Sequence, residues 1–96
     1  MTAAQVLRKA RALLVEGGWT RRRFTCDGRH CALGAIYYYG NPGDSVIQAA
    51  EIALQEAKPG PIGESIISWN DRQRSKEPVL AAFDLAISRA EKRGRK

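Results

Sequence analysis

The sequence has few of the side chains that most metal and catalytic sites need. Its 96 residues include one histidine, two cysteines and one methionine. Cys26, His30 and Cys31 offer three zinc ligands, but a structural zinc site takes four, and the rest of the chain supplies no further cysteine or histidine. We therefore expect neither a bound metal nor a cofactor.

Long apolar runs are absent as well. No uninterrupted apolar segment approaches the roughly 20 residues that a membrane-spanning helix needs. Arg8, Lys9 and Arg11 interrupt the region in which a secretory signal would carry its apolar core. Two cysteines without such a signal fit reduced thiols better than a disulfide. These absences predict a soluble, cytoplasmic protein that has no contact with a membrane.

The length of the chain limits the number of domains. A chain of 96 residues has room for one domain with one core, and its hydrophobic content of 44% is too high for a disordered protein. We predict a single helical domain over residues 1–91, followed by a flexible basic tail over residues 92–96 that has no apolar anchor. Because so short a chain buries little surface, a homodimer stays open as an alternative to a monomer.

Charged residues are unevenly distributed along the chain. The formal net charge of +6 divides into +5 over residues 1–43, −4 over residues 44–71 and +5 over residues 72–96. A protein with an acidic middle and basic ends can present two opposite faces to a partner.

Hydrophobic periodicity predicts an all-α fold. Thr2 is expected to cap the first helix, and the glycine pair at residues 17–18 is expected to end it. The last helix is expected to be capped by Ser75, with Pro78 in its first turn. Apolar residues at helical spacing indicate the remaining boundaries, which give helices over residues 3–16, 31–39 and 44–57 and a short helix over residues 65–70. We predict a compact domain of four to five helices.

The segment that begins at Cys31 is expected to form a central buried helix, because it is apolar or small on every side. Before it, the Asp-Gly pair at residues 27–28 is typical of a two-residue turn and predicts a short β-hairpin in which Phe24 faces Cys31. Gly34 costs the helix roughly 1 kcal/mol of propensity. We attribute this glycine to the close approach of another helix backbone.

Cys31 has two interpretations. At the start of a helix, backbone amides and the helix dipole stabilise a thiolate, so a thiol-dependent enzyme is one alternative. His30 would then be the base, but adjacent residues diverge by about 100° on a helix and point to opposite faces on a strand. We favour a buried, structural Cys31 and expect no enzymatic activity.

The triplet Trp69, Asn70 and Asp71 also has two interpretations. In the first, Asn70 and Asp71 contact a ligand beside the indole ring. In the second, which we favour, Trp69 fills core space, Asn70 adopts a left-handed conformation at a helix end, and Asp71 accepts a hydrogen bond from an amide or an arginine.

A run of arginines is the main indication of nucleic-acid binding, since phosphate contacts are electrostatic. The helix over residues 44–57, which follows a turn, contains Glu51 and Glu56 and no arginine or lysine, so we do not expect sequence-specific reading of the major groove. Sequence-independent binding stays open. Its candidate contacts are Arg21, Arg22, Arg23, Arg29, Arg93, Arg95 and Lys96.

Three consecutive tyrosines, Tyr37, Tyr38 and Tyr39, cannot all be buried on one side of a helix. Exposed tyrosine is favoured at protein interfaces, and Leu85, which lies off the inner stripe of the last helix, extends the candidate contact surface. The alternative is that these rings only cover the edge of the core with their hydroxyl groups in water.

The order of several elements resembles a family of small uncharacterised proteins of actinobacteria and their phages. The resemblance covers nearly the whole chain and rests on Trp19-Thr20, Cys31-Ala32-Leu33-Gly34-Ala35 and Trp69-Asn70-Asp71, between an opening and a closing helix. The family has no established activity, so the resemblance implies no catalytic residue. It implies a phage or phage-derived gene in a bacterial cytoplasm. Cys26 and the triple arginine depart from the usual pattern.

These observations lead to one principal hypothesis and two alternatives. The principal hypothesis is a non-enzymatic phage accessory factor that binds a host protein through exposed tyrosines and its separated charges. The first alternative is sequence-independent nucleic-acid binding through the arginines and the basic tail. The second is thiol-dependent catalysis at Cys31.

Overall fold

The computed structural model describes residues 1–93, which form five helices and one two-stranded antiparallel hairpin. The predicted helical class and helix number are therefore confirmed. Of the expected nucleic-acid contacts, Arg95 and Lys96 lie outside the described residues. The elements are α1 (Ala3–Gly17), β1 (Thr25–Cys26), β2 (Arg29–His30), α2 (Ala32–Tyr37), α3 (Ser45–Ala57), α4 (Ile66–Asp71) and α5 (Glu77–Arg93).

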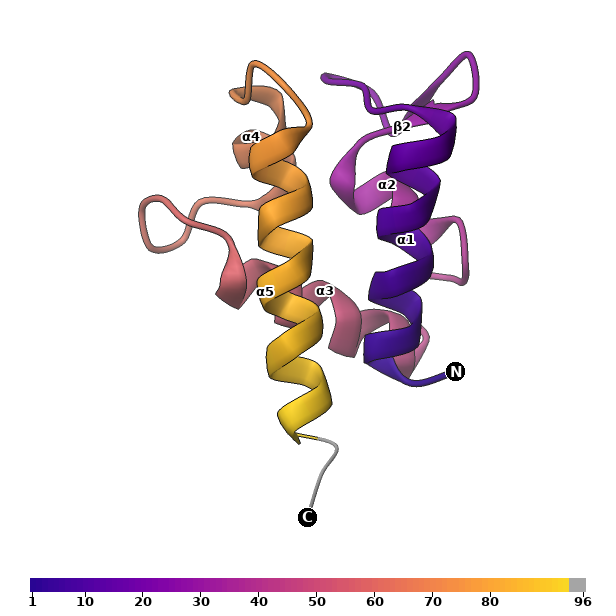
Figure 1. Cartoon of the computed structure of the whole chain (residues 1–96), viewed down its shortest axis with the longest axis vertical. Helices are drawn as coiled ribbons and strands as arrows, with labels where there is room; N and C mark the ends of the chain where they lie inside the picture. The colour runs from indigo at the N-terminus through magenta and orange to yellow at the C-terminus, as the bar shows by residue number, and fades with distance from the viewer. Residues whose placement is uncertain (94–96) are drawn as a thin grey trace.

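The two longest helices, α1 and α5, run antiparallel beside each other and form one layer (Figure 1). α3 packs across both of them, and α2 packs against α1, α3 and α4. The hairpin lies at the end of the molecule where α1 ends and α5 begins (Figure 1). Over residues 1–93, no helix combines the length and the apolar character that crossing a bilayer requires.

The core lies between these helices. Every residue from Cys31 to Ile36 is buried, so the expected central helix is present. The other large side chains that are fully buried come from α1, α3, α4 and α5: Val6, Leu7, Leu14, Leu54, Trp69, Val79 and Phe83. Helices from both ends of the chain therefore contribute to one apolar core.

Both ends of α1 form as the sequence predicts. The Thr2 hydroxyl accepts a hydrogen bond from the Gln5 amide at 3.2 Å, and the Gln5 side chain accepts one from the Thr2 amide at 2.8 Å. Gly18 follows the helix with φ +98°, a conformation that favours glycine. Its carbonyl accepts from the His30 amide at 3.1 Å, so the chain continues directly alongside the hairpin.

The hairpin has the predicted register, with Cys26 opposite Arg29. Beyond it, the Cys31 amide donates to the Phe24 carbonyl at 3.0 Å, which places these two residues face to face as expected. Both Cys26 and Cys31 are free thiols.

The predictions for the neighbour of Gly34 and for the cap of the last helix are wrong. A Cβ on Gly34 would lie 2.2 Å from the carbonyl oxygen of Phe24, so the close neighbour is the segment that leads into β1 and not another helix. Ser75 does not cap the last helix. α5 begins at Glu77, and a carboxylate in the first turn interacts favourably with the helix dipole. The Lys76 carbonyl accepts a hydrogen bond from the Leu80 amide at 2.9 Å.

α5 extends beyond residue 91, the expected end of the helical domain. The flexible tail was expected from Lys92, whereas the helix extends through Arg93. Arg93 donates to the Glu56 carboxylate at 3.2 Å, which ties the end of α5 to the end of α3.

Candidate functional site

Asn70 is the centre of a buried hydrogen-bond network. It is fully buried and lies inside α4, so the expected left-handed helix-end conformation is wrong. Its side-chain oxygen accepts from the Trp19 indole at 2.7 Å and from the Ala32 amide at 3.0 Å. Its side-chain nitrogen donates to the Thr20 carbonyl at 3.1 Å. One amide side chain thus joins α4, the end of α1 and the start of α2.

Asp71 extends this network to the arginine segment, residues 21–23. Its carboxylate accepts from the Arg22 backbone amide at 2.6 Å, as the sequence predicted for a nearby amide. Arg22 has φ +68°, which is unusual for a residue with a side chain. The Asp71 bond therefore stabilises a backbone turn that presents Arg22 and Arg23 on the surface, where both are exposed.

Cys31 lies directly before α2 and caps it. Its sulfur accepts from the Gly34 amide at 3.2 Å, and only 4% of the residue is exposed. Burial raises the pKa of the Cys31 thiol, which outweighs the hydrogen bond from Gly34. The His30 ring instead packs edge-on against Tyr38 at 5.4 Å, and burial lowers its pKa. This geometry offers a protonated thiol rather than a nucleophile paired with a base.

A small cavity of about 70 Å³ opens beside Cys31. Phe24 and Ile67 line it and are 48% and 42% exposed. Arg22, Arg23 and Asp71 complete its wall. We call this feature the Phe24–Ile67 pocket. It combines an apolar opening with two arginines, and its lining residues come from two segments, residues 22–31 and residues 67–71.

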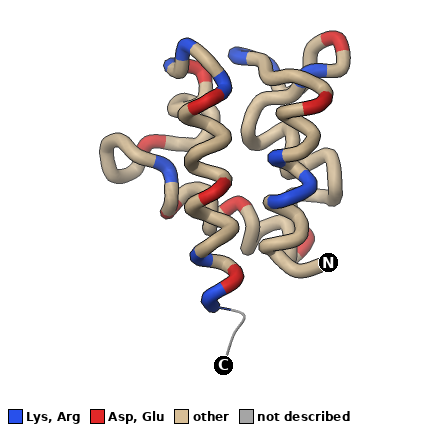
Figure 2. Tube along the Cα trace, in the orientation of Figure 1, with Lys and Arg blue, Asp and Glu red and all other residues tan. Residues whose placement is uncertain are grey.

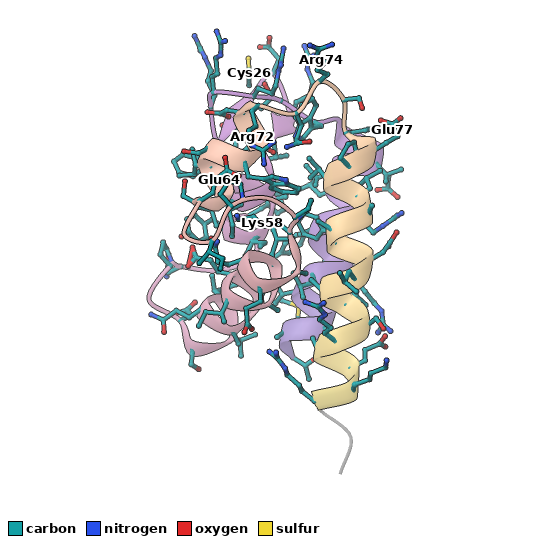
Figure 3. All side chains as sticks on the ribbon, turned by 90° about the vertical axis from the view of Figure 1, so that its left-hand side faces the viewer. Cys26, Lys58, Glu64, Arg72, Arg74 and Glu77 are labelled. Carbon is teal, nitrogen blue, oxygen red and sulfur yellow. The ribbon has the colours of Figure 1, made fainter. Side chains whose placement is uncertain are left out.

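The arginine segment belongs to a larger basic surface. Arg21 lies 5.9 Å from the Trp19 ring centre and donates to the Gln73 carbonyl at 2.9 Å, so the α4–α5 connection lies beside the arginine segment. Figure 2 shows Lys and Arg on both segments at this end, and Figure 3 places Arg74 at the same end as Cys26. We call this surface the basic end: Arg21, Arg22, Arg23, Arg29, Arg74 and Lys76.

Sequence reasoning did not place Arg74 and Lys76 in this surface. Nothing in the local sequence indicates that residues 72–76 return to the arginine segment, because this contact depends on how α4 packs against α2. Arg93, by contrast, lies near the far end of α5 from the hairpin (Figure 1). It and the arginine segment do not form a continuous surface.

Only one of the three tyrosines is well exposed. Tyr38 is 63% exposed, whereas Tyr37 donates to the Glu51 carboxylate and Tyr39 donates to the Lys9 carbonyl at 3.2 Å. Burial and the Glu51 contact raise the pKa of Tyr37 to about 12. Leu85 is 42% exposed but belongs to α5, which packs on α1 and α3. The tyrosine contact surface is therefore smaller than the sequence suggested.

The acidic middle of the chain does not form a separate acidic face. Glu51 and Asp71 accept from Tyr37 and Arg22 as described above. Asp44 accepts from the Asn41 amide at 3.0 Å, and Glu56 and Glu64 pair with arginines. Within residues 1–93, no cluster of three His, Cys, Asp or Glu side chains has the geometry to hold a metal ion.

Comparison with known proteins gives a family but no activity. The family described as "Family of unknown function (DUF6197)" matches residues 1–89. The chain belongs to this family. No curated protein and no solved structure matches it.

The family match covers most of the features described above. Residues 1–89 include the whole Asn70 network, the Phe24–Ile67 pocket and the basic end. Arg93 and the expected tail lie outside the matched residues. We therefore look for a function shared by the family within residues 1–89.

Proposed function

We propose that this protein is a non-enzymatic interaction domain that binds an acidic protein segment at the Phe24–Ile67 pocket. The observation that carries the proposal is the combination of two exposed apolar side chains with Arg22 and Arg23 around one cavity. Protein interfaces typically combine an apolar centre with a polar rim. The expected partner segment carries an apolar side chain with carboxylates beside it.

The size of the pocket suits one side chain. A volume of about 70 Å³ is a little more than twice the roughly 30 Å³ that a water molecule occupies in the liquid. A short aliphatic side chain fits this space and would contact Phe24 and Ile67. Apolar anchors of this kind supply much of the affinity of protein interfaces.

The charge of the pocket favours carboxylates. Among the described residues, neither the Arg22 nor the Arg23 guanidinium has an ion-pair partner, and both are exposed. Asp71, the carboxylate in the wall, already accepts from the Arg22 amide. Complementary charge increases the association rate and the specificity of such contacts.

A second copy of the chain is a poor occupant for this pocket. In a two-fold symmetric dimer the same patch meets itself, so Arg22 and Arg23 would face the arginines of the other copy. Like charges across an interface are unfavourable. We therefore favour a different protein over a homodimer.

The proposed origin of the partner rests on the sequence resemblance. The Trp-Asn-Asp and Cys-Ala-Leu-Gly-Ala elements resemble proteins of actinobacteria and their phages, which supports a phage-derived accessory factor that acts on a host protein in the cytoplasm. The acidic segment of the partner is then expected in a host protein.

Capture from an actinobacterial lysate at moderate salt tests the proposal. The Phe24→Ser/Ile67→Ser double variant should lose a protein that the wild type retains. Ile52→Ser is the matched control, because Ile52 is also exposed, at 55%, but lies on α3. An identified partner with an acidic segment, retained by Ile52→Ser and lost by the double variant, supports the proposal. No partner, or one that the double variant retains equally, contradicts it.

Sequence-independent nucleic-acid binding is the second candidate, and the basic end favours it. Arg22, Arg23, Arg29, Arg74 and Lys76 have no ion-pair partner among residues 1–93. A gel-shift titration over a range of salt concentrations separates this candidate from the first. Replacement of the arginine segment should flatten the salt dependence by up to about three ion equivalents. The Phe24→Ser/Ile67→Ser variant should leave nucleic-acid binding unchanged.

A further inference from the structure

The connection between α3 and α4 begins with a lysine whose stem is buried and whose ammonium group has no protein partner among residues 1–93. Lys58 follows α3 directly and is 8% exposed. Within residues 1–93, its ammonium group makes neither a hydrogen bond nor an ion pair. The aliphatic stem of Lys58 is buried while its ammonium nitrogen stays accessible to solvent, and an ammonium group has three donors. The Lys58 ammonium therefore has capacity for a ligand.

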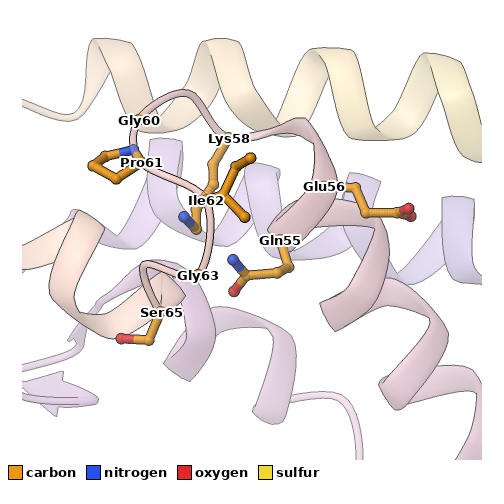
Figure 4. A pocket seen from close by; sticks show the side chains of 8 residues that line it. All are labelled: Gln55, Glu56, Lys58, Gly60, Pro61, Ile62, Gly63 and Ser65. Atoms are coloured by element: carbon orange, nitrogen blue, oxygen red, sulfur yellow. The ribbon is translucent and has the colours of Figure 1, made fainter.

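The lysine points into an open cavity. The cavity has a volume of about 640 Å³ and is lined by Gln55, Glu56, Lys58, Gly60, Pro61, Ile62, Gly63 and Ser65. Figure 4 shows the Lys58 side chain running beneath the loop, with its nitrogen inside the space that the loop encloses. We call this cavity the loop hollow. Its volume falls in the range of about 300–1,000 Å³ that is typical of small-molecule sites.

Backbone amides add further donors to the loop hollow. The amides of Gly60, Ile62 and Gly63 have no acceptor among residues 1–93, and all three residues line the cavity. Gly60 and Gly63 have φ +114° and +89°, conformations that side chains disfavour. Pro61 has no amide, so Ile62 and Gly63 supply the consecutive free amides, an arrangement that commonly binds anions.

The neighbouring carboxylates do not neutralise Lys58. The two Glu64 oxygens accept from the Arg72 guanidinium at 2.8 and 2.9 Å, and Glu56 pairs with Arg93. Figure 3 shows Arg72, Glu64 and Lys58 on one face of the molecule. The Arg72 contact lowers the pKa of Glu64, so this carboxylate stays charged and bound to Arg72. Lys58, Arg72 and Arg93 carry three positive charges beside the two negative charges of Glu56 and Glu64, so these groups around the loop hollow sum to +1.

The Glu64–Arg72 pair also fixes the shape of the loop. A Cβ on Gly60 would lie 2.5 Å from an Arg72 guanidinium nitrogen and 3.0 Å from a Glu64 oxygen, so the Gly60 backbone rests on the ion pair. The Gln55 side chain donates to the Glu64 carbonyl at 2.7 Å. Ile62 is fully exposed at the rim, where it can contact the organic part of a ligand.

We infer that the loop hollow is a binding site for a phosphate monoester, with the Lys58 ammonium and the loop amides as its donors. A tetrahedral phosphate offers several acceptor oxygens to donors that come from different directions. This site is separate from the Phe24–Ile67 pocket and does not depend on the proposed partner. The phosphate can belong to a small metabolite or to a phosphorylated protein side chain.

A phosphate titration of the full chain, followed by the backbone amide signals in NMR at constant ionic strength, tests the inference. We expect saturable changes in the amide chemical shifts of Gly60, Ile62 and Gly63. Adenosine monophosphate and phosphoserine, titrated separately, distinguish the two sources by which binds more tightly. Acetate should bind more weakly than phosphate.

Variants make the result specific to Lys58. Lys58→Met should weaken phosphate binding by about tenfold or more, the loss expected for one charge-assisted contact. Lys76→Met, a lysine of the basic end, is the matched control and should bind like the wild type. Lys58→Gln provides a second variant should Lys58→Met fail to fold. Shifts that do not saturate, that centre on the basic end, or that persist in both Lys58 variants would overturn the inference.

Discussion

Asn70 and Lys58 are both buried residues by exposed area, but their polar atoms lie in opposite environments. Asn70 is fully buried, and its oxygen and nitrogen together make bonds to Trp19, Ala32 and Thr20. Lys58 is 8% exposed as a residue, but its ammonium group is accessible to solvent and makes no hydrogen bond or ion pair within residues 1–93. A buried polar group that is satisfied internally helps to specify a fold, whereas an accessible ammonium group without a protein partner keeps its donors for a ligand.

The comparison separates the hairpin end of the molecule, where the Asn70 network lies, from the loop that we propose binds phosphate. The Asn70 network holds the arginine segment against α2 and α4, so the basic end has a defined shape. The loop hollow is held at its base by Glu64 and Arg72, but its interior donors have no acceptor. The predictions below test this difference, from the largest expected effect to the smallest.

Removal of the Asn70 side chain should have the largest effect. Asn70→Ala leaves the Trp19 indole, the Ala32 amide and the Thr20 carbonyl without their partner. We expect the free energy of unfolding in urea to fall by about 3 kcal/mol. Asn41→Ala is the control, because Asn41 is exposed, and it should change the value by less than about 0.5 kcal/mol. Equal effects of the two variants would contradict the structural role of Asn70.

Gly34→Ala should be the next most damaging change. The new methyl group would lie 2.2 Å from the Phe24 carbonyl oxygen, which also accepts from Cys31. Moving this backbone should cost about 2 kcal/mol or more in urea denaturation. Gly43→Ala is the matched control, since nothing lies within 4 Å of a Cβ there. A neutral Gly34→Ala would show that the packing of α2 against the hairpin is looser than described.

These two glycines and Asn70 show what the sequence can and cannot predict. Periodicity, the Thr2 cap and the Asp-Gly turn depend on neighbouring residues, and they predicted the helices, the hairpin and its register. The identity of the segment against Gly34 depends on tertiary packing, so the prediction of a helix was wrong. The left-handed Asn70 was wrong for the same reason, because its partners Trp19 and Ala32 are remote in sequence.

The candidate site was predictable only in part. The arginine segment and Asp71 were each identified, but their contact through the Arg22 amide required the fold. The fold was also needed to place Ile67 in the Phe24–Ile67 pocket, and Arg74 and Lys76 in the basic end. Lys58 had no signal in the sequence beyond a turn rich in proline and glycine, since its burial depends on the path of the loop around it.

Acid should destabilise the hairpin end through His30, the one histidine of the chain. Burial lowers its pKa in the folded state below the ordinary value of 6.5. The corresponding stability is present above pH 6.5 and is lost as pH falls toward the folded-state pKa, because the unfolded chain takes up the proton first. The free energy of unfolding should decline in the wild type as pH falls below 6.5. His30→Gln should give a flat profile, and a profile unchanged by this substitution would exclude His30 as the cause.

Lys58→Met should have the smallest effect on stability. The substitution keeps an unbranched, buried stem and removes an ammonium group that has no protein partner among residues 1–93. We expect the free energy of unfolding in phosphate-free buffer to stay within about 1 kcal/mol of the wild type. A loss as large as that of Asn70→Ala would mean that Lys58 has a structural partner.

The contrast between Asn70 and Lys58 is tested most directly by measuring the free energy of unfolding of the wild type and of Lys58→Met. Each protein is measured with and without phosphate at constant ionic strength. A ligand that binds only the folded protein stabilises it by about 1.4 kcal/mol at ten times its dissociation constant. The wild type should gain this stability, and Lys58→Met, which binds phosphate about tenfold more weakly or worse, should gain about 0.4 kcal/mol or less. Equal gains in both proteins, or no gain in either, would contradict the assignment of Lys58 as a ligand-binding residue.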